Sequence, residues 1–149
     1  MERHENAVKE FMEGYRCSQV VVAAYAPDFN VDVDLARKIS LALAGGSGVG
    51  GECGAVSAAY LVLGLKYGFA DPGNPEGVAT VIAKTREFAE KFKSLHGAID
   101  CPKLLNLDVF SEEGHRTFVE KNMKAETCAR FVGDTVKILD DMLTEEETN

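Results

Sequence analysis

The chain has 149 residues, of which 46% are hydrophobic, and this is enough for one domain with a substantial core that needs no disulfide or metal to fold. Its formal net charge of −8 and pI near 4.9 argue against binding to nucleic acid or anionic membranes, because both favour clustered lysine and arginine. The start has no apolar signal region and no apolar run is long enough to span a membrane. We therefore expect a cytoplasmic protein without membrane insertion.

Helical periodicity begins at the N-terminus. A first helix is predicted over residues 1–13, and Gly14 is expected to kink the chain before the apolar pattern resumes at Cys17. This second stretch stops at Pro27, because proline removes a backbone donor and disfavours helix before it.

Two further helices are predicted on either side of a glycine-rich stretch. The first starts at Asp34, a candidate N-cap, and places Leu35 and Ile39 on an apolar face until Gly45 ends it. The second, residues 53–67, is apolar on nearly all sides and too long for a strand, which predicts a buried central helix.

The second half of the chain continues the helical pattern. Residues 76–96 give the clearest amphipathic stripe, which includes Val78, Ile82, Phe88, Phe92 and Leu95. A short helix is predicted after Pro102 and a longer one over residues 128–143, followed by an acidic tail, 144–149, that is predicted to be disordered. The whole chain, 1–149, is therefore predicted to be all-α, a single-domain bundle of about six to seven helices around the buried central helix.

Each of the four cysteines is predicted to lie in the first turn of a different helix: Cys17, Cys53, Cys101 and Cys128. A helix N-terminus has unpaired N–H groups and a partial positive charge, which favour thiolate over thiol. In a reducing cytoplasm, cysteines serve catalysis, redox sensing or metal binding more often than structural disulfides. We therefore expect the four thiols to converge on one site, although an ordinary core role is equally consistent with Cys17.

Spacing excludes several familiar sites. No two cysteines form C-x-x-C, so thioredoxin, zinc-ribbon and ferredoxin patterns are absent, and without C-x-x-C-H no c-type haem is expected. Dithiol exchange, a thiolate-bound metal and an iron–sulfur cluster all remain open, because ligands need to meet only in the fold.

The glycine-rich stretch contains a literal G-x-G-x-x-G at Gly46, Gly48 and Gly51. No strand precedes it, so we expect no NAD site and take a flexible connection as the plain alternative. Because glycines allow close approach of the backbone, the candidates for cofactor binding are those around Cys53: Gly50, Gly51 and Gly54.

Cys53 is the predicted nucleophile, because it follows the glycines at a helix start. Its pKa is expected to lie below the ordinary value despite Glu52, with one of the other three cysteines resolving the intermediate. His96 is expected at a helix C-terminus and His115 on the surface.

Four segments resemble one family: GYRCSQVV, ECGAVSAAYLVLGLKYG, CPKLLNLD and TCARFVGDTVKIL. They are similar to the small redox-active proteins named for their C_GCAxxG_C_C pattern, over roughly residues 14–143. The resemblance implies an all-helical fold and assigns the four characteristic cysteines to Cys17, Cys53, Cys101 and Cys128. One position departs from it, because Ala58 stands where the family has glycine.

The sequence thus predicts a thiol-based redox protein that exchanges dithiol and disulfide with an unknown redox partner. The alternatives are a non-enzymatic metal or iron–sulfur protein that uses Cys17, Cys53, Cys101 and Cys128 as ligands, and a helical partner-binding module with structural cysteines. Self-association into a homo-oligomer is left open.

Overall fold

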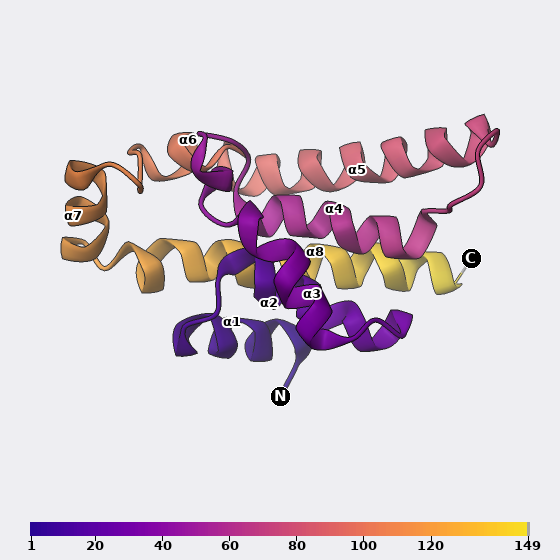
Figure 1. The fold of residues 1–149 in the computed structure, drawn as a ribbon, viewed down its shortest axis with the longest axis horizontal. Helices are drawn as coiled ribbons and strands as arrows, with labels where there is room; N and C mark the ends of the chain where they lie inside the picture. Colours follow the sequence, from indigo (N-terminus) through magenta and orange to yellow (C-terminus); the bar gives the residue numbers. More distant parts are fainter. Residues whose placement is uncertain (149) are drawn as a thin grey trace.

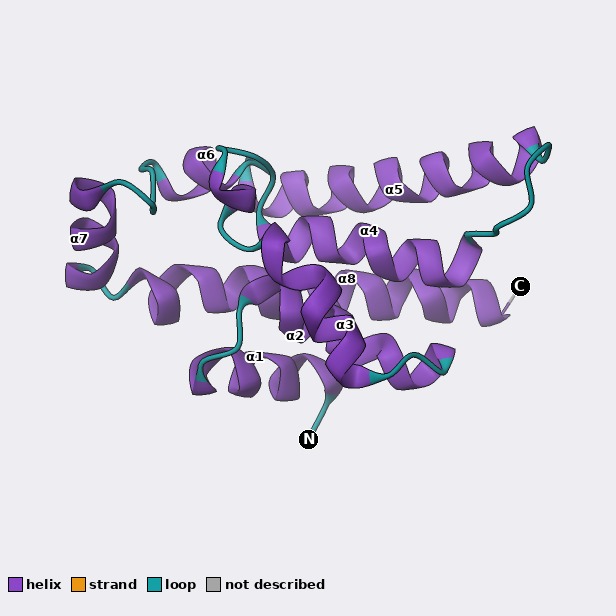
Figure 2. Ribbon diagram, viewed as in Figure 1, coloured by secondary structure: helices purple, strands orange, loops and turns teal. Residues whose placement is uncertain are grey.

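Apolar residues at helical spacing form eight α-helices in the computed structural model, which describes residues 1–148. The helices are α1 (Arg3–Glu13), α2 (Cys17–Tyr25), α3 (Val33–Ser40), α4 (Gly54–Tyr67), α5 (Pro75–His96), α6 (Cys101–Leu105), α7 (Glu112–Glu120) and α8 (Ala129–Thr148). Figure 2 shows no strand within this described part of the chain, so the predicted all-α class is confirmed.

Three long helices, α4, α5 and α8, run side by side along the long axis of the molecule (Figure 1). Helix α1 packs against α8 on the side away from α5, and α2 contacts α1, α3, α4 and α8. The short helices α6 and α7 lie at one end of the bundle, where α5 ends and α8 begins (Figure 1). This end also receives the loop before α4.

The centre of the core is shared by α4 and α2. In α4 the residues Ala55, Val56, Ala58, Ala59 and Val62 have no exposed surface, as expected for a helix that is apolar on nearly all sides. Helix α4 packs against α2, α5 and α8, as its burial on all sides requires. No helix in residues 1–148 is both long and apolar enough to cross a membrane.

A polar contact joins α2 to α8. The hydroxyl of Tyr25 lies 2.7 Å from Asp140 Oδ1 and 3.0 Å from the carbonyl oxygen of Val136, and the guanidinium of Arg3 lies 3.1 Å from the same carboxylate. Burial, and then the Asp140 carboxylate, raise the pKa of Tyr25, so the hydroxyl stays a donor. The contact fixes α1, α2 and α8 together.

Several helix boundaries differ from the sequence prediction. Gly14, with φ of +123°, ends α1 rather than kinking a continuous helix. The N-cap of α3 is Asp32, whose carboxylate accepts the N–H of Leu35, and not Asp34. Helix α8 continues through Thr148, whereas a disordered tail was predicted over 144–149, because glutamates are good helix formers. Residue 149 lies outside the described residues.

Two predicted apolar faces are only partly buried. In α5, Phe88 and Phe92 are fully buried, but Val78 is 52% exposed in the first turn, which reaches past the end of α4 (Figure 1), and Leu95, near the other end of the helix, is 62% exposed. In α3, Leu35 and Ile39 point outward, and the buried residues are Ala36 and Ser40.

This difference in burial between positions of α5 is testable. The Phe88→Ala variant should lose about 3–5 kcal/mol of unfolding free energy, because a fully buried aromatic side chain is replaced by a cavity. The Val78→Ala variant on the same helix should change it by no more than about 0.5 kcal/mol. Urea denaturation followed by circular dichroism measures both, and equal losses would contradict the description of α5.

Candidate functional site

Three of the four cysteines begin helices as predicted. Cys17 is the first residue of α2, Cys101 is the first residue of α6, and Cys53 is the N-cap of α4. The prediction is wrong for Cys128, which is the last residue of a π-helical turn, Lys124–Cys128, that runs directly into α8. The N–H that follows Cys128 is already bonded to the carbonyl of Lys124, so no free helix N-terminus acts on this thiol.

A short antiparallel bridge joins the segments before α4 and α6. The N–H of Cys53 donates to the carbonyl of Ile99 at 2.7 Å, and the N–H of Cys101 donates to the carbonyl of Gly51 at 2.9 Å. Side chains alternate in extended chain, so Cys53 and Cys101 lie on one side of this bridge, as a diagonal pair. Both of these cysteines are buried.

On the opposite side of the bridge lie the carboxylates of Glu52 and Asp100. Both raise the pKa of Tyr60, after the larger effect of burial, and Tyr60 is hydrogen-bonded to Glu52. The acidic neighbours of two cysteines are therefore directed away from the sulfur atoms.

Gly54 brings the first cysteine against this bridge. A Cβ placed at Gly54 would lie 2.6 Å from Cys17 Sγ and 2.9 Å from both the Cα of Ala44 and the carbonyl oxygen of Leu43. Such distances are too short for any side chain, so only glycine allows the sulfur to rest on the start of α4. Gly54, a predicted cofactor-binding residue, thus has a steric reason to be glycine.

All four cysteines line one cavity of about 640 Å³, which is where the sequence predicted them to converge. Its wall is mostly apolar, and the larger apolar side chains are Phe11, Leu41, Leu104, Leu105, Val109, Phe110, Phe118 and Phe131. The charged or ionisable side chains other than the cysteines are Arg16, His115 and Lys124. His115 is exposed, as predicted, and also lies at this cavity.

The Cys17 sulfur has the most favourable surroundings for a negative charge. Burial raises its pKa, and this effect is opposed by hydrogen bonds from four backbone N–H groups, those of Gly45, Ser18, Cys17 and Ala55. Cys17 is also only partly buried and therefore open to the cavity.

The other three thiols are harder to ionise. Burial, followed by the charge of Cys17, raises the pKa of Cys101 to about 11 and that of Cys128 to about 12. The pKa of Cys53 is also raised, by burial and then by Cys17, although the N–H groups of Ala55 and Val56 oppose the shift. The expectation that the pKa of Cys53 lies below its ordinary value is wrong, because burial exceeds the effect of its two amide donors.

The glycine-rich loop before α4 packs against Cys101 and the bridge segment. Gly51 N–H donates to the carbonyl of Gly46 at 2.9 Å, and a Cβ at Gly46 would lie 2.7 Å from the Gly51 oxygen and 3.1 Å from Cys101 Cβ. Of the predicted cofactor-binding glycines, Gly54 lines the large cavity, Gly50 lines a separate one of about 270 Å³, and Gly51 lines neither. Cys101 is reached from both cavities.

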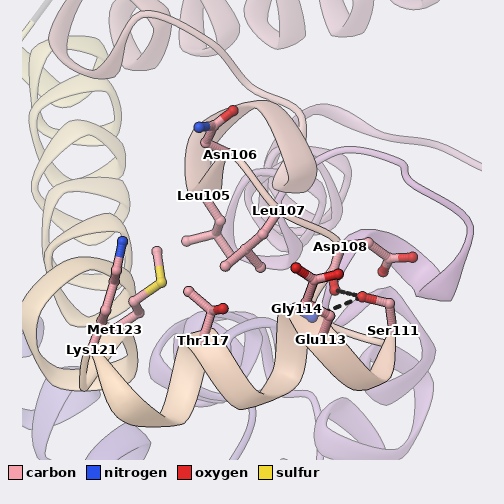
Figure 3. Close-up of a pocket in the computed structure, with 10 residues that line it drawn as sticks. All are labelled: Leu105, Asn106, Leu107, Asp108, Ser111, Glu113, Gly114, Thr117, Lys121 and Met123. Carbon is pink, nitrogen blue, oxygen red and sulfur yellow. Dashed lines mark hydrogen bonds between the residues drawn. The ribbon is translucent and has the colours of Figure 1, made fainter.

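A third cavity, of about 420 Å³, lies between α6 and α7 (Figure 3). Leu105 points into it and also lines the cysteine cavity. Ser111, whose hydroxyl caps α7 through the N–H of Gly114, closes one end. No cysteine lines this cavity, so we do not assign it to the candidate site.

Sequence reasoning missed the basic residues and the aromatic wall. Arg16 precedes Cys17 directly and Lys124 lies one helical turn before Cys128, so their positions in the sequence offered a signal. Phe110 and Phe118 had none, because they are distant from every cysteine in a segment where no helix was predicted.

The four thiols are free in this structure. Among the described residues, no group of three or more histidine, cysteine, aspartate or glutamate side chains is arranged to hold a metal ion.

The fold and the site define an all-α protein with four cysteines on separate elements around one cavity. A family model described as "Putative redox-active protein (C_GCAxxG_C_C)" matches residues 15–142, and the chain belongs to this family. No curated protein and no solved structure is similar enough to the chain to match it.

The order of ionisation predicts an order of alkylation. In reduced protein at pH 8.5, iodoacetamide should modify Cys17 first, whereas a pKa near 11 leaves less than about 1% of Cys101 as thiolate, against about half in an unfolded chain. The Cys101 rate should rise as the pH approaches 11. Peptide mass spectrometry measures the rates, and the same reaction in denaturant gives the reference. Modification of Cys53 ahead of Cys17 would contradict the assignment.

Gly54→Ala should displace the Cys17 sulfur from its amide donors. The expected result is slower alkylation of Cys17 at pH 8.5 and an upward shift of its apparent pKa, because the new methyl carbon would lie only 2.6 Å from the sulfur and force it to move. Gly64→Ala, in the same helix with open space around the added methyl, is the matched control and should leave the rate unchanged. Equal rates in both variants would show that the contact does not position the sulfur.

Proposed function

We propose that this protein is a thiol–disulfide exchange protein in which Cys17 is the attacking thiolate. The observation that carries this proposal is that four cysteines line one cavity and that Cys17, the most amide-stabilised of them, opposes ionisation of the other three. The effect of Cys17 on each of the other three thiols supports their closeness in this cavity. Membership of a family described as redox-active supports the same conclusion.

The assignment of the nucleophile to Cys17 replaces the sequence-based choice of Cys53. Cys17 is partly exposed to the cavity, whereas Cys53 is 7% exposed and has two amide donors instead of four. Cys53 is the preferred resolving thiol, because Cys17 Sγ rests on Gly54, the next residue in the chain.

The proposed reaction converts two thiols and an external disulfide into one protein disulfide and two external thiols. The Cys17 thiolate attacks one sulfur of the external disulfide, a mixed disulfide forms, and the first external thiolate leaves. Cys53, after losing its proton to the leaving thiolate or to water, attacks Cys17 Sγ and expels the second thiolate. Two electrons pass from the cysteines to the external disulfide, and the redox partner is therefore a disulfide-bearing molecule or protein in the cytoplasm.

The test is oxidation of reduced, anaerobically purified protein with a defined disulfide buffer. We expect a loss of the mass of two hydrogen atoms, a disulfide that includes Cys17 in peptide mapping, and a midpoint potential between about −270 and −120 mV, where exchange proteins lie. Cys17→Ser should prevent formation of this disulfide. Cys101→Ser, in a variant that keeps Cys17 and Cys53, should not.

Elemental analysis and absorbance spectra of the same preparation distinguish the alternative. Stoichiometric metal or iron with sulfide, together with four thiols that resist oxidation, would replace the exchange function by thiolate metal or cluster binding through Cys17, Cys53, Cys101 and Cys128. If the four thiols neither oxidise nor bind metal, the remaining alternative is a helical partner-binding module with structural cysteines.

A further inference from the structure

The cysteine cavity is far larger than thiol chemistry requires. Disulfide formation between neighbouring thiols needs no empty space, and a water molecule accounts for about 30 Å³ of liquid volume, whereas this cavity measures about 640 Å³. Cavities of about 300–1,000 Å³ with apolar and aromatic walls hold small organic ligands. The size and lining of the cavity therefore correspond to a molecule of that class.

The aromatic lining comes from four separate parts of the fold. Phe11 belongs to α1, Phe118 to α7 and Phe131 to α8, while Phe110 precedes α7. Phe110 packs its ring against Gly45, where a Cβ would lie 2.5 Å from the ring, yet its side chain is 62% exposed. Leu41, at the same cavity, is 48% exposed. A ligand in the cavity would remove this apolar surface from water, which is favourable.

The charged residues that line the cavity favour a ligand with a negative charge. The chain has 24 acidic residues against 16 lysines and arginines, but no aspartate or glutamate lines this cavity, whereas Arg16, Lys124 and His115 do. Lys124 Nζ lies 5.1 Å from the centroid of the Phe11 ring, over its face. A cationic ligand would meet like charges, and an anionic ligand would meet two permanent positive charges.

These two charges are also unpaired with acidic groups. Several basic residues elsewhere form ion pairs with carboxylates, among them Arg3, Lys9, Arg37, Lys103 and Arg116. Within the described residues, Arg16 and Lys124 have no carboxylate within 4.0 Å. Each is therefore available to an acid group brought in from solution.

The geometry points to a small-molecule site in the cysteine cavity for an organic acid with a flat, aromatic body. The body packs among Phe11, Phe118 and Phe131, and the acid group contacts the basic rim of the cavity, that is, Arg16, which is exposed, and Lys124, which is half-buried. Cys17 lines the same cavity, so a bound molecule covers its sulfur. This binding goes beyond the dithiol exchange proposed above and does not depend on it, because it concerns the reduced protein.

The probe for this site is 8-anilinonaphthalene-1-sulfonate, an aromatic sulfonate whose fluorescence rises in an apolar environment. Titration of the reduced, folded protein should show saturable binding to one site. Replacing both rim charges, in Arg16→Gln/Lys124→Gln, should weaken binding about ten-fold, as expected for two partly exposed charge contacts. The control Arg130→Gln/Lys137→Gln removes the same charge from exposed positions of α8 and should leave affinity unchanged.

Two further measurements assign the binding to this cavity. N-phenyl-1-naphthylamine, which has the same aromatic body without the sulfonate, should bind wild type and the rim variant equally. Saturating sulfonate should also slow alkylation of Cys17 by iodoacetamide at least about ten-fold, because the bound probe covers the sulfur, and the control variant should show the same protection. Circular dichroism confirms that each variant is folded.

Three results would overturn the inference: absence of saturable sulfonate binding, equal affinity in wild type and the rim variant, or binding that leaves Cys17 alkylation unchanged. None of them bears on the exchange function, which is measured by loss of hydrogen mass in the absence of any probe. Conversely, if the thiols fail to oxidise, the exchange function is contradicted but the result of the sulfonate titration is unaffected.

Discussion

The cysteine site depends on two main-chain hydrogen bonds, Cys53 N–H to Ile99 and Cys101 N–H to Gly51. Each contributes only about 0.5–1.5 kcal/mol, but together they set the register of two loops that are distant in sequence. That register directs both sulfur atoms to one side and the neighbouring carboxylates, Glu52 and Asp100, to the other, where they affect Tyr60. Glu52 was expected to oppose ionisation of Cys53 as its neighbour in sequence, but alternation along the extended segment separates the two side chains.

Within this frame, the cavity favours a single negative charge. Burial disfavours every thiolate, and the amide donors are concentrated on Cys17, which receives four, while Cys53 receives two. Once Cys17 is charged, it raises the pKa of Cys53, Cys101 and Cys128. In the exchange reaction proposed above, Cys17 is therefore the attacking thiolate, and the other three cysteines stay protonated while it carries the charge. Oxidation removes the charge that opposes the others, so the thiol that reacts first also eases ionisation of those that follow.

The sequence was a good guide to class and to the helices that carry the cysteines, because apolar periodicity and helix-start signals are local. The residues of the cavity wall could not be predicted from the sequence. Phe110, Phe118 and Lys124 come to the cysteine cavity because the chain turns back on itself at α6 and α7 (Figure 1), and no local pattern shows this turn. The reactivity of Cys53 was misjudged for a related reason. A helix N-terminus can be recognised in a sequence, but the depth of burial that outweighs it is set by the neighbours of that terminus in the fold. The outward-facing Leu35 and Ile39 show the same limit, since periodicity identifies an apolar face without showing whether another element covers it.

The overall charge and the local charge of this molecule have opposite signs, and distance decides which one acts on a ligand. The net charge of −8 repels anions in solution, but at physiological ionic strength this field decays over a Debye length of about 8 Å. Arg16 and Lys124 act at contact distance beside an apolar wall, well within a Debye length, where salt screens their charges less. Small anions without an apolar body gain little there, because they lose hydration and find few partners in the aromatic wall. An organic acid with an aromatic body gains from burial of that body and from contact of its acid group with the two positive charges. The aromatic lining and the basic rim together therefore select a molecule that has an aromatic body and an acid group.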